Sequence, residues 1–353
     1  MKQSVVILKR FQFYARRKTL TIKDIAKESG CAVGTVSRVL NNQEYVSEKT
    51  RAKVMEVVNK YNFVLNTNAK ALKARGTKTI LILVKGTSNI LLNSLLETVQ
   101  KNMENLPYTS KVIVLDEYDN ETVEAEKELR ENKPMGIIFL GGNPERNREV
   151  FPRIKCPCVL ITTKADTEEY ENLSSVSTDS LEASAMVARH LVEKGHRNIG
   201  VIGGDLVSSA TSRRRFAGFT QGLETCGISF DKEKAYATSK YSLEGGAKAA
   251  EELLEKYEGM TAIFAMSDMQ AMGACRKIRD MGYRIPEDIS VVGFDGLPIT
   301  QFYCPKITTV RQNEEELAVQ GLRILVDAIE NKTGAIHKNI PFEFIEGESV
   351  KKI

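Results

Sequence analysis

Apolar side chains recur at helical spacing near the start of the chain and predict three short helices. The first helix has Thr21 as its N-cap and Asp24 in its first turn, and Gly30 ends it. The second helix is expected over 33–41, and the third begins after the N-cap Ser47. The apolar stripes of these helices consist of Ile22, Ile25, Ala26, Val36, Val39, Leu40, Val54, Val57, Val58 and Tyr61. Two short helices around a glycine turn, braced by a third, fit a helix-turn-helix, although the pattern alone is equally typical of a plain three-helix bundle.

The polar face of the second helix carries side chains suited to reading DNA. It presents Gly34, Thr35, Ser37, Arg38 and Asn41. In a helix-turn-helix this face meets base edges in the major groove, where Arg38 can pair with two acceptors of a guanine. Asn41 is suited to an adenine or to a phosphate. The pattern is therefore compatible with a module that binds double-stranded DNA, and it leaves the plain three-helix bundle open.

From Thr79 onward, short β-branched runs alternate with amphipathic helices. Strands are expected at 79–84, 111–115, 136–140, 157–161, 198–203, 261–266 and 289–294, with helices such as 180–194 and 243–257 between them. This alternation is typical of parallel sheets that are covered by helices on both faces. The stretch from 79 to the end is long enough for two such doubly wound halves. We expect a ligand between them, at the carboxyl ends of the strands.

Charge is distributed unevenly along the chain. Residues 1–80 contain 17 Lys and Arg against 5 Asp and Glu, whereas the remainder contains 33 basic and 41 acidic residues. A basic head on a mildly acidic body is typical of a nucleic-acid-binding module joined to a domain with another task. Residues 1–18 are the basic start of this head, and we expect either a disordered leader or an arm that contacts phosphates.

Several classes of protein are disfavoured by what the sequence lacks. No apolar run approaches the roughly 20 residues that span a membrane, and Val5 to Leu8 is too short for a signal-peptide core, so we expect a cytoplasmic protein. Dinucleotide-binding, Walker-type and nucleophile-elbow motifs are absent, so we expect no catalytic residues and no cofactor. Cys156 and Cys158 stand one residue apart without a second Cys or His pair nearby, which favours buried hydrophobes over a metal site.

The stretches Thr21–Asn41 and Val46–Arg51 closely resemble the DNA-binding signature of the lactose-repressor/galactose-repressor (LacI/GalR) family. The resemblance implies a helix-turn-helix over 19–65, in which Val33 and Gly34 specify bases and Arg38 reads a guanine. Further residues at the family's phosphate-contacting positions are Thr21, Thr35, Ser37, Asn41 and Ser47. Cys31 and Ala32 replace a Val-Ser pair of the family, which removes a hydroxyl, and the small Val33 and Gly34 leave their bases to apolar contact.

Residues 66–78 correspond to the family's hinge helix, which is disordered without DNA and folds in the minor groove of the operator. Leu72 lies at the position of the leucine that wedges between base steps at the dyad, and such wedges kink the duplex. Ala69 and Lys70 are expected to line the same groove. Leu65 replaces the usual proline before the hinge, so its entry is less rigid.

The resemblance extends over the body to about residue 345 and implies an effector core over 79–353, similar to periplasmic sugar-binding proteins, with crossings between its halves near 178 and 308. Arg213 and Arg215 lie at the family's positions, and Arg215 corresponds to an arginine that donates to ligand hydroxyls. Asp295 corresponds to a carboxylate that accepts from sugar hydroxyls. Other polar residues expected in this cleft are Ser88, Asn89, Thr162, Ser267 and Gln312.

Together these features predict a homodimeric transcriptional regulator, expected to repress carbohydrate-utilisation genes from a pseudo-palindromic operator under the control of a small sugar-like effector. One alternative is a global regulator of the catabolite-control type, whose co-effector is a phosphoprotein. A second is a sugar-binding protein without a role at DNA, which the basic head argues against.

Overall fold

The computed structural model describes residues 22–40, 46–61, 78–86, 89–165 and 169–353. By their internal contacts, Met1–Thr77 and Lys78–Ile353 form two separate units. The predictions for Thr21, Asn41, Ala69, Lys70, Leu72 and Ser88, for the basic start 1–18 and for residues 66–77 of the hinge lie outside the described residues.

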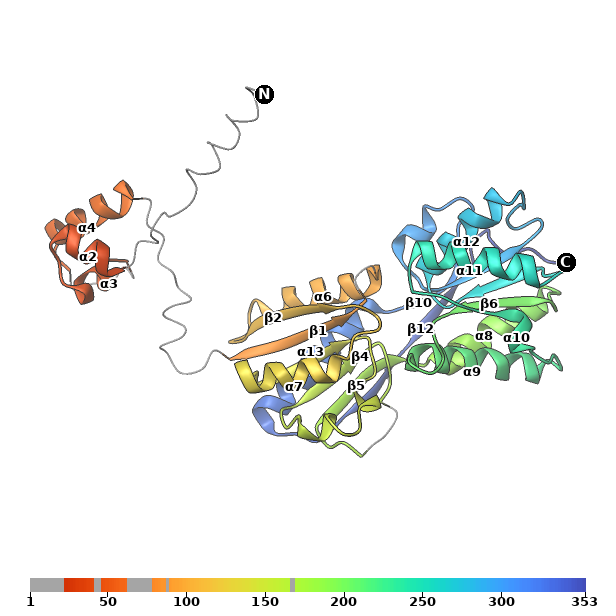
Figure 1. The fold of residues 1–353 in the computed structure, drawn as a ribbon, viewed down its shortest axis with the longest axis horizontal. Coiled ribbons are helices and arrows are strands. Elements are labelled where there is room, and N and C mark those ends of the chain that lie inside the picture. Colours follow the sequence, from red (N-terminus) through yellow and green to blue (C-terminus); the bar gives the residue numbers. More distant parts are fainter. Residues whose placement is uncertain (1–21, 41–45, 62–77, 87–88, 166–168) are drawn as a thin grey trace, which may run out of the picture. The chain divides into compact units, whose positions relative to one another are not determined.

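The first unit contains three short helices, α2 (Ile22–Ser29), α3 (Val33–Leu40) and α4 (Glu48–Lys60) (Figure 1). Ile25, Val36 and Val54, one from each helix, are fully buried and form its small core. Gly30 ends α2 with φ of +65°, a conformation that costs glycine little because it has no Cβ. The three helices and the glycine turn between the first two agree with the sequence pattern.

The second unit consists of two halves, each built on a six-stranded sheet. The N-half sheet has the order β11-β5-β4-β3-β1-β2, and the C-half sheet has the order β12-β10-β9-β8-β6-β7. The N-half strands are β1 (Thr79–Lys85), β2 (Thr109–Leu115), β3 (Gly136–Leu140), β4 (Cys158–Ile161), β5 (Leu173–Thr178) and β11 (His337–Ile340). The C-half strands are β6 (Ile199–Gly203), β7 (Tyr236–Thr238), β8 (Ala262–Ala265), β9 (Ser290–Asp295), β10 (Thr308–Gln312) and β12 (Phe342–Ile345). Among the described residues, all strand pairs are parallel except β10 with β12.

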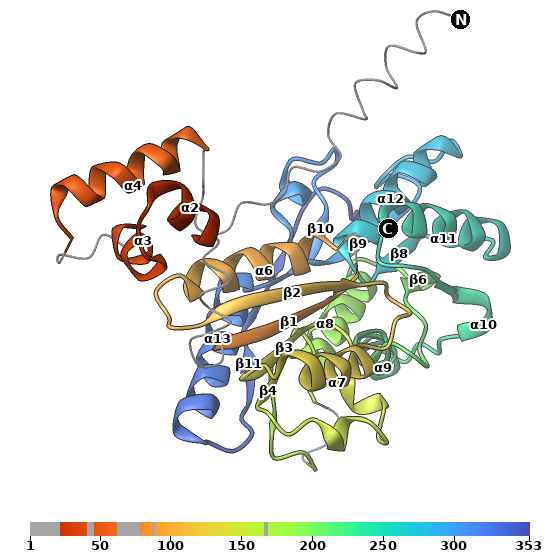
Figure 2. The ribbon, with the colours of Figure 1, turned by 60° about the vertical axis from the view of Figure 1, so that its left-hand side comes forward.

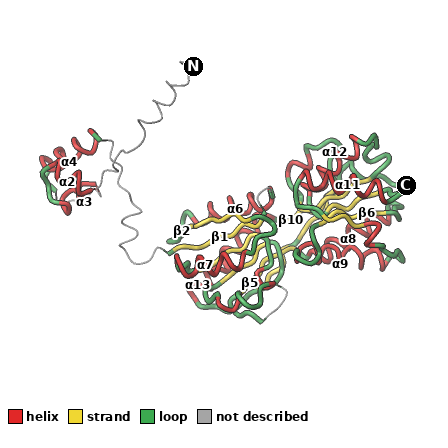
Figure 3. The backbone as a smooth tube through the Cα atoms, viewed as in Figure 1, coloured by secondary structure: helices red, strands yellow, loops and turns green. Residues whose placement is uncertain are grey.

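Helices cover both faces of each sheet, as parallel strands require (Figures 2 and 3). In the N-half, α6 (Ile90–Met103) and α13 (Glu314–Asn331) pack on one face, and α7 (Glu121–Asn132) lies on the other with the 3-10 turns η2 (Pro144–Arg146) and η3 (Phe151–Arg153). In the C-half, α8 (Ser180–Glu193) and α9 (Ala210–Thr225) lie on one face, and α11 (Leu243–Lys256) and α12 (Asp268–Asp280) on the other. The short elements α10 (Lys232–Ala235) and η4 (Pro298–Gln301) connect strands of the C-half. The prediction of two doubly wound, parallel halves is confirmed.

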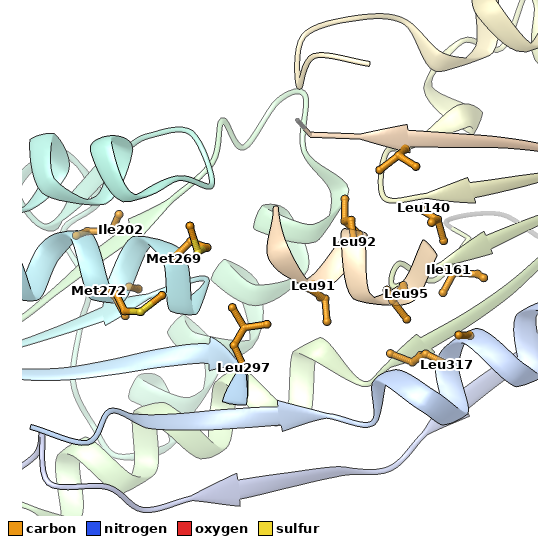
Figure 4. Packing of buried hydrophobic residues seen from close by; sticks show 14 of the residues in the cluster. Leu91, Leu92, Leu95, Leu140, Ile161, Ile202, Met269, Met272, Leu297 and Leu317 are labelled. Atoms are coloured by element: carbon orange, nitrogen blue, oxygen red, sulfur yellow. The ribbon is translucent and has the colours of Figure 1, made fainter. Parts of the chain in front are cut away.

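The chain passes between the two halves three times: after β5, after β10 and between β11 and β12. The third passage is not foreseen from the sequence. Buried apolar side chains of both halves join in one cluster, whose members include Leu91 of α6 and Leu297 of the C-half (Figure 4). Among the helices of the described residues, none is long and apolar enough to cross a membrane.

Candidate functional site: a DNA-reading helix and an effector cleft

Helix α3 has one buried and one exposed face, as a recognition helix requires. Val36 and Val39 point into the core, whereas Val33 is 42% exposed and Arg38 is also exposed. Thr35 and Ser37 are half-buried between these faces. A Cβ built at Gly34 would meet no atom within 4 Å, so the surface beside it is open. The predicted base-contacting residues of the described helix therefore share its outer face.

The starts of α3 and α4 differ in a way that follows from their sequences. The Ser47 hydroxyl caps α4 and accepts from the backbone N–H of Thr50 at 3.4 Å, which confirms the predicted N-cap. Helix α3 begins on the carbonyl of Ala32, which accepts from the N–H groups of Thr35 and Val36 at 2.9 and 3.0 Å. Ala32 has no side-chain oxygen, so this helix start lacks the hydroxyl that Ser47 supplies to the next one.

Tyr61 does not belong to the apolar stripe in which the sequence pattern places it. Its side chain is 38% exposed, and its hydroxyl donates to Glu28 Oε1 at 2.8 Å. Lys60 donates to the same oxygen at 3.1 Å, and these two hydrogen bonds lower the pKa of Glu28. Tyr61 follows the last residue of α4, so it ties the end of α4 to α2 at the surface and leaves the core to Val54, Val57 and Val58.

The second candidate site is a cleft between the two halves of the second unit, enclosing about 860 Å³ of space including its open mouth. Residues that follow the carboxyl ends of the strands line it, together with the first turns of α6 and α9. Of the residues predicted for an effector, Asn89, Thr162, Arg215 and Asp295 line this cleft. The strand-end position is the one at which parallel α/β proteins bind small molecules.

Arg215 and Asp295 form the most deeply buried polar cluster of the cleft. Arg215 comes from α9, and its Nη2 lies 3.3 Å from Oδ1 of Asp295 at the end of β9. Gln312, at the end of β10, donates from Nε2 to the same carboxylate oxygen at 2.9 Å. The guanidinium also donates to the carbonyl of Met266 and lies 3.6 Å from the centre of the Phe294 ring. Among the described residues, Arg215 Nε and Gln312 Oε1 are buried without a hydrogen-bond partner.

Burial perturbs the acids of this cluster. It raises the pKa of Asp295 to about 7, and the nearby Asp268 adds to the rise while Arg215 and Gln312 oppose it. Burial likewise raises the pKa of Asp268 to about 6, against hydrogen bonds from Thr309 and Leu297. A carboxyl group with such a pKa can donate or accept a proton near neutral pH, and this suits it to hydrogen bonding with hydroxyl groups.

Two strand-end residues of the cleft have left-handed backbones. Thr162 has φ of +83° and Asp295 has φ of +124°, and neither is a glycine. Such strain concentrates at functional sites, where the surrounding structure holds it. Gly296, which follows Asp295, has φ of +75°, and a Cβ there would collide with Arg311. The backbone at this position therefore requires glycine.

Three predicted effector residues do not line the cleft. Ser267 is the N-cap of α12 and accepts from the N–H of Gln270 at 3.2 Å. Gln312 stands behind Asp295, which it positions. Arg213 donates to the carbonyls of Leu206 and Val207, because residues two apart on a helix project to different sides and Arg215 faces the cleft.

Sequence reasoning also missed cleft residues, notably Lys85, Glu117, Asp205 and Tyr241. Each of them follows or ends a strand, and this is the only sequence signal that they offer. Among the residues that the structure describes, no group of three or more His, Cys, Asp or Glu side chains is arranged to hold a metal ion.

Comparison with known proteins assigns both parts of the chain. Residues 21–66 match bacterial regulatory proteins of the lacI family, and residues 188–350 match the periplasmic binding protein-like domain. The transcriptional regulator MalR of Clostridium butyricum is 32% identical over 336 residues, which cover 94% of this chain and 99% of MalR.

Solved structures show the same fold along nearly the whole chain. The lac repressor dimer bound to operator and the anti-inducer ONPF has a TM-score of 0.73 at 23% identity, covering 95% of this chain and 100% of that one. The complex of the transcriptional regulator CelR with cellobiose has a TM-score of 0.68 at 24% identity, covering 94% and 99%. With a relative of this similarity over its full length, the chain belongs to the LacI family of bacterial regulatory proteins and is a transcriptional regulator rather than an enzyme.

Proposed function

We propose that the chain is a repressor of carbohydrate-utilisation genes whose DNA affinity is controlled by a small, hydroxyl-rich effector in the cleft. The observation that carries this proposal is the buried Arg215–Asp295 pair, which lines the cleft at the strand ends between the two halves. A guanidinium donor beside a carboxylate acceptor matches the paired donors and acceptors of a polyol.

The charges of the cleft favour an uncharged effector over a phosphorylated one. Its lining contains two cations among the described residues, and each already pairs with a carboxylate: Lys85 with Glu121 at 2.6 Å and Arg215 with Asp295 at 3.3 Å. Asp205 adds an acid whose pKa is lowered by hydrogen bonds from Ser208. Phosphate sites in proteins commonly supply free arginines or lysines, and both cations of this lining are already paired, so its side-chain charges favour an uncharged sugar.

At the operator, we infer that Arg38 reads a guanine and that Val33 and Gly34 make apolar contacts. Their exposure on the outer face of α3 supports these roles. The other members of the DNA-contacting set are the phosphate-contacting Thr21, Thr35, Ser37, Asn41 and Ser47, and the minor-groove residues Ala69, Lys70 and Leu72. A homodimer on a two-fold axis would place two such helices on a pseudo-palindrome. The lac repressor, which the chain resembles in fold, is a dimer on its operator. Such a regulator would act in the cytoplasm, where the DNA lies.

A ligand screen on the full chain tests the effector. Thermal unfolding is followed with uncharged mono- and disaccharides and with the phosphorylated form of each monosaccharide. We expect a rise in Tm with an uncharged sugar and a change in operator affinity at the same concentration, because binding and allosteric response are linked. Stabilisation by phosphorylated sugars alone would contradict the proposed ligand class. A response only to a phosphorylated protein would favour the catabolite-control alternative.

A further inference from the structure

The loop that follows β2 in the N-half reaches across the mouth of the cleft to the turn that follows β7 in the C-half. Asp116 accepts from Lys240 Nζ through both carboxylate oxygens, at 3.3 and 3.2 Å. Lys240 Nζ also lies 4.8 Å from the centre of the Tyr118 ring. Next to this pair, Glu117 Oε1 accepts the backbone N–H of Tyr241 at 3.0 Å. Two short segments that are far apart in sequence therefore hold the two halves together.

Glu117 differs from its neighbours because it also faces the ligand space. It lines the cleft and is half-buried, whereas the Asp116 and Lys240 side chains are 46% and 45% exposed. An exposed ion pair of that kind contributes little because water screens it. A carboxylate that accepts a backbone N–H in a partly buried place forms a stronger, charge-assisted hydrogen bond. Glu117 is thus the central residue of this contact.

Tyr241, the partner of Glu117, is itself tied to the ligand-facing end of α9. Its hydroxyl lies 2.8 Å from the Ser212 hydroxyl, which also accepts the N–H of Gly204 at 3.1 Å. Gly204 and Tyr241 both line the cleft. A displacement of Tyr241 therefore moves Ser212, which lies about one turn before Arg215 on α9.

A second polar contact joins the halves elsewhere on the cleft. The hydroxyls of Thr163, which follows β4, and Thr211, in the first turn of α9, lie 2.9 Å apart. Both this contact and the Glu117–Tyr241 bond need the halves to be close together, since a hydrogen bond weakens steeply when its donor and acceptor move apart. Together, these two contacts join the N-half to the C-half across the cleft.

From this geometry we infer that Glu117 is a positioning residue of the effector cleft, whose bond to the Tyr241 N–H latches the two halves together. The regulatory role of this latch rests on the proposed function: if an effector in the cleft controls DNA affinity, the latch links effector binding to closure of the two halves. The latch itself is a property of the second unit and exists whether or not the ligand is a sugar.

Hydrogen exchange of the full-length protein tests the latch without ligand or DNA. The probe is the amide of Tyr241, followed in peptides that cover 236–245. We expect Glu117→Ala to raise its exchange rate by about tenfold or more, because the amide loses a charged acceptor. Glu117→Gln retains a neutral carbonyl oxygen at the same place and is expected to exchange at a rate between those of the parent and the alanine variant. Glu131→Ala, which removes an exposed glutamate of α7, is the matched control and is expected to change nothing.

Disulfide trapping measures closure independently. In the double substitution Thr163→Cys and Thr211→Cys, the two thiols should form a disulfide under mild oxidation, and adding Glu117→Ala should slow its formation several-fold. Unchanged exchange at Tyr241 in the alanine variant, a glutamine variant that exchanges as fast as the alanine variant, or an unaltered rate of trapping would each overturn the latch. Slow exchange of the β1 and β3 amides verifies that every variant is folded. Because no test here uses DNA or effector, its failure is distinct from failure of the proposed function.

Discussion

Arg215 and Asp295 pair at 3.3 Å with side chains that are each 3% exposed, and both belong to the C-half of the effector unit. The pair therefore needs no residue of the N-half, and Arg215 Nε is buried without a hydrogen-bond partner among the described residues. Burying two charges is costly unless their hydrogen bonds are satisfied. A ligand that accepts from this N–H would remove part of that cost when it binds.

Substitution of this pair should separate ligand binding from stability. Arg215→Ala is expected to abolish the effector response and, by leaving a buried carboxyl group without its partner, to lower the free energy of unfolding by about 3 kcal/mol. The double substitution Arg215→Ala with Asp295→Asn should regain part of that stability without regaining the response. Urea unfolding and thermal shift with the effector measure the two quantities. Equal stability of the single and double variants would contradict the role assigned to the unpaired carboxyl group.

The raised pKa of Asp295 predicts how stability depends on pH. The folded protein binds a proton at this site more readily than the unfolded chain, whose aspartates titrate near pH 4. This contribution to stability is fully present below about pH 4 and is lost as pH rises to about 7. Asp295→Asn removes the titration, so the stability of the variant relative to the parent should increase over this range. Urea unfolding of both proteins at several pH values measures the free energy of unfolding of the variant minus that of the parent. A difference that stays constant or declines as pH rises would contradict the prediction.

The parts of the fold that follow hydrophobic periodicity are the parts that sequence predicts. Strand β5 (Leu173–Thr178) was missed because three of its six residues are serines, yet all six are buried. Two of these serines bond to β11 and the residue before it: Ser174 Oγ accepts the N–H of Ile336 at 3.1 Å, and Ser175 Oγ lies 2.8 Å from His337 Nδ1. Those partners lie 162 residues further along the chain, so no local sequence pattern predicts them.

The same reason limits prediction of the cleft. Arg215 and Asp295 were found because they lie in stretches that resemble the family, whereas Glu117 and Tyr241 become neighbours only when the two halves meet, 124 residues apart. Arg213 shows the converse: it lies at a family position that predicts a place in the site, yet its side chain donates to the carbonyls of Leu206 and Val207 instead of lining the cleft. Residue type and family position identify candidates, and the fold decides which of them face the ligand.

Close packing of α8 against α9 predicts a large effect of a small substitution. A Cβ at Gly218 of α9 would overlap the backbone of Leu181 in α8. Gly218→Ala is therefore expected to destabilise the effector unit by about 1–3 kcal/mol, because the two helices must separate. Thermal or urea unfolding of this unit measures the loss. An unchanged Tm would show that the helices move apart without cost.

Gly34 offers the contrasting case in the DNA-binding unit. A Cβ there meets nothing within 4 Å, and the residue lies inside α3. Gly34→Ala should stabilise this unit by about 0.5–1 kcal/mol, since alanine favours the helix, while adding a methyl group to the reading face. We therefore expect a more stable helix and an altered preference at one base pair of each half-site. Helix unfolding monitored by circular dichroism, with operator selection from a randomised site, tests both effects. Loss of stability on this substitution would mean that the surface beside Gly34 is not open.

Arg38 provides the most direct test of the DNA-reading face. Its side chain is exposed on α3 next to the buried Val39, which fixes the helix face that it occupies. Arg38→Ala should cost about 1–3 kcal/mol of discrimination against the wrong base and leave nonspecific, salt-dependent binding in place, because the phosphate contacts that we propose come from other residues. Arg38→Lys is the matched control: it keeps the positive charge but loses the planar fork that pairs with two acceptors of one guanine, so discrimination should be intermediate. Gel-shift titrations of operator and scrambled DNA at two salt concentrations separate base discrimination from nonspecific binding. If Arg38→Ala weakened both DNAs equally, Arg38 would be a phosphate contact, and base reading would have to come from elsewhere on the helix.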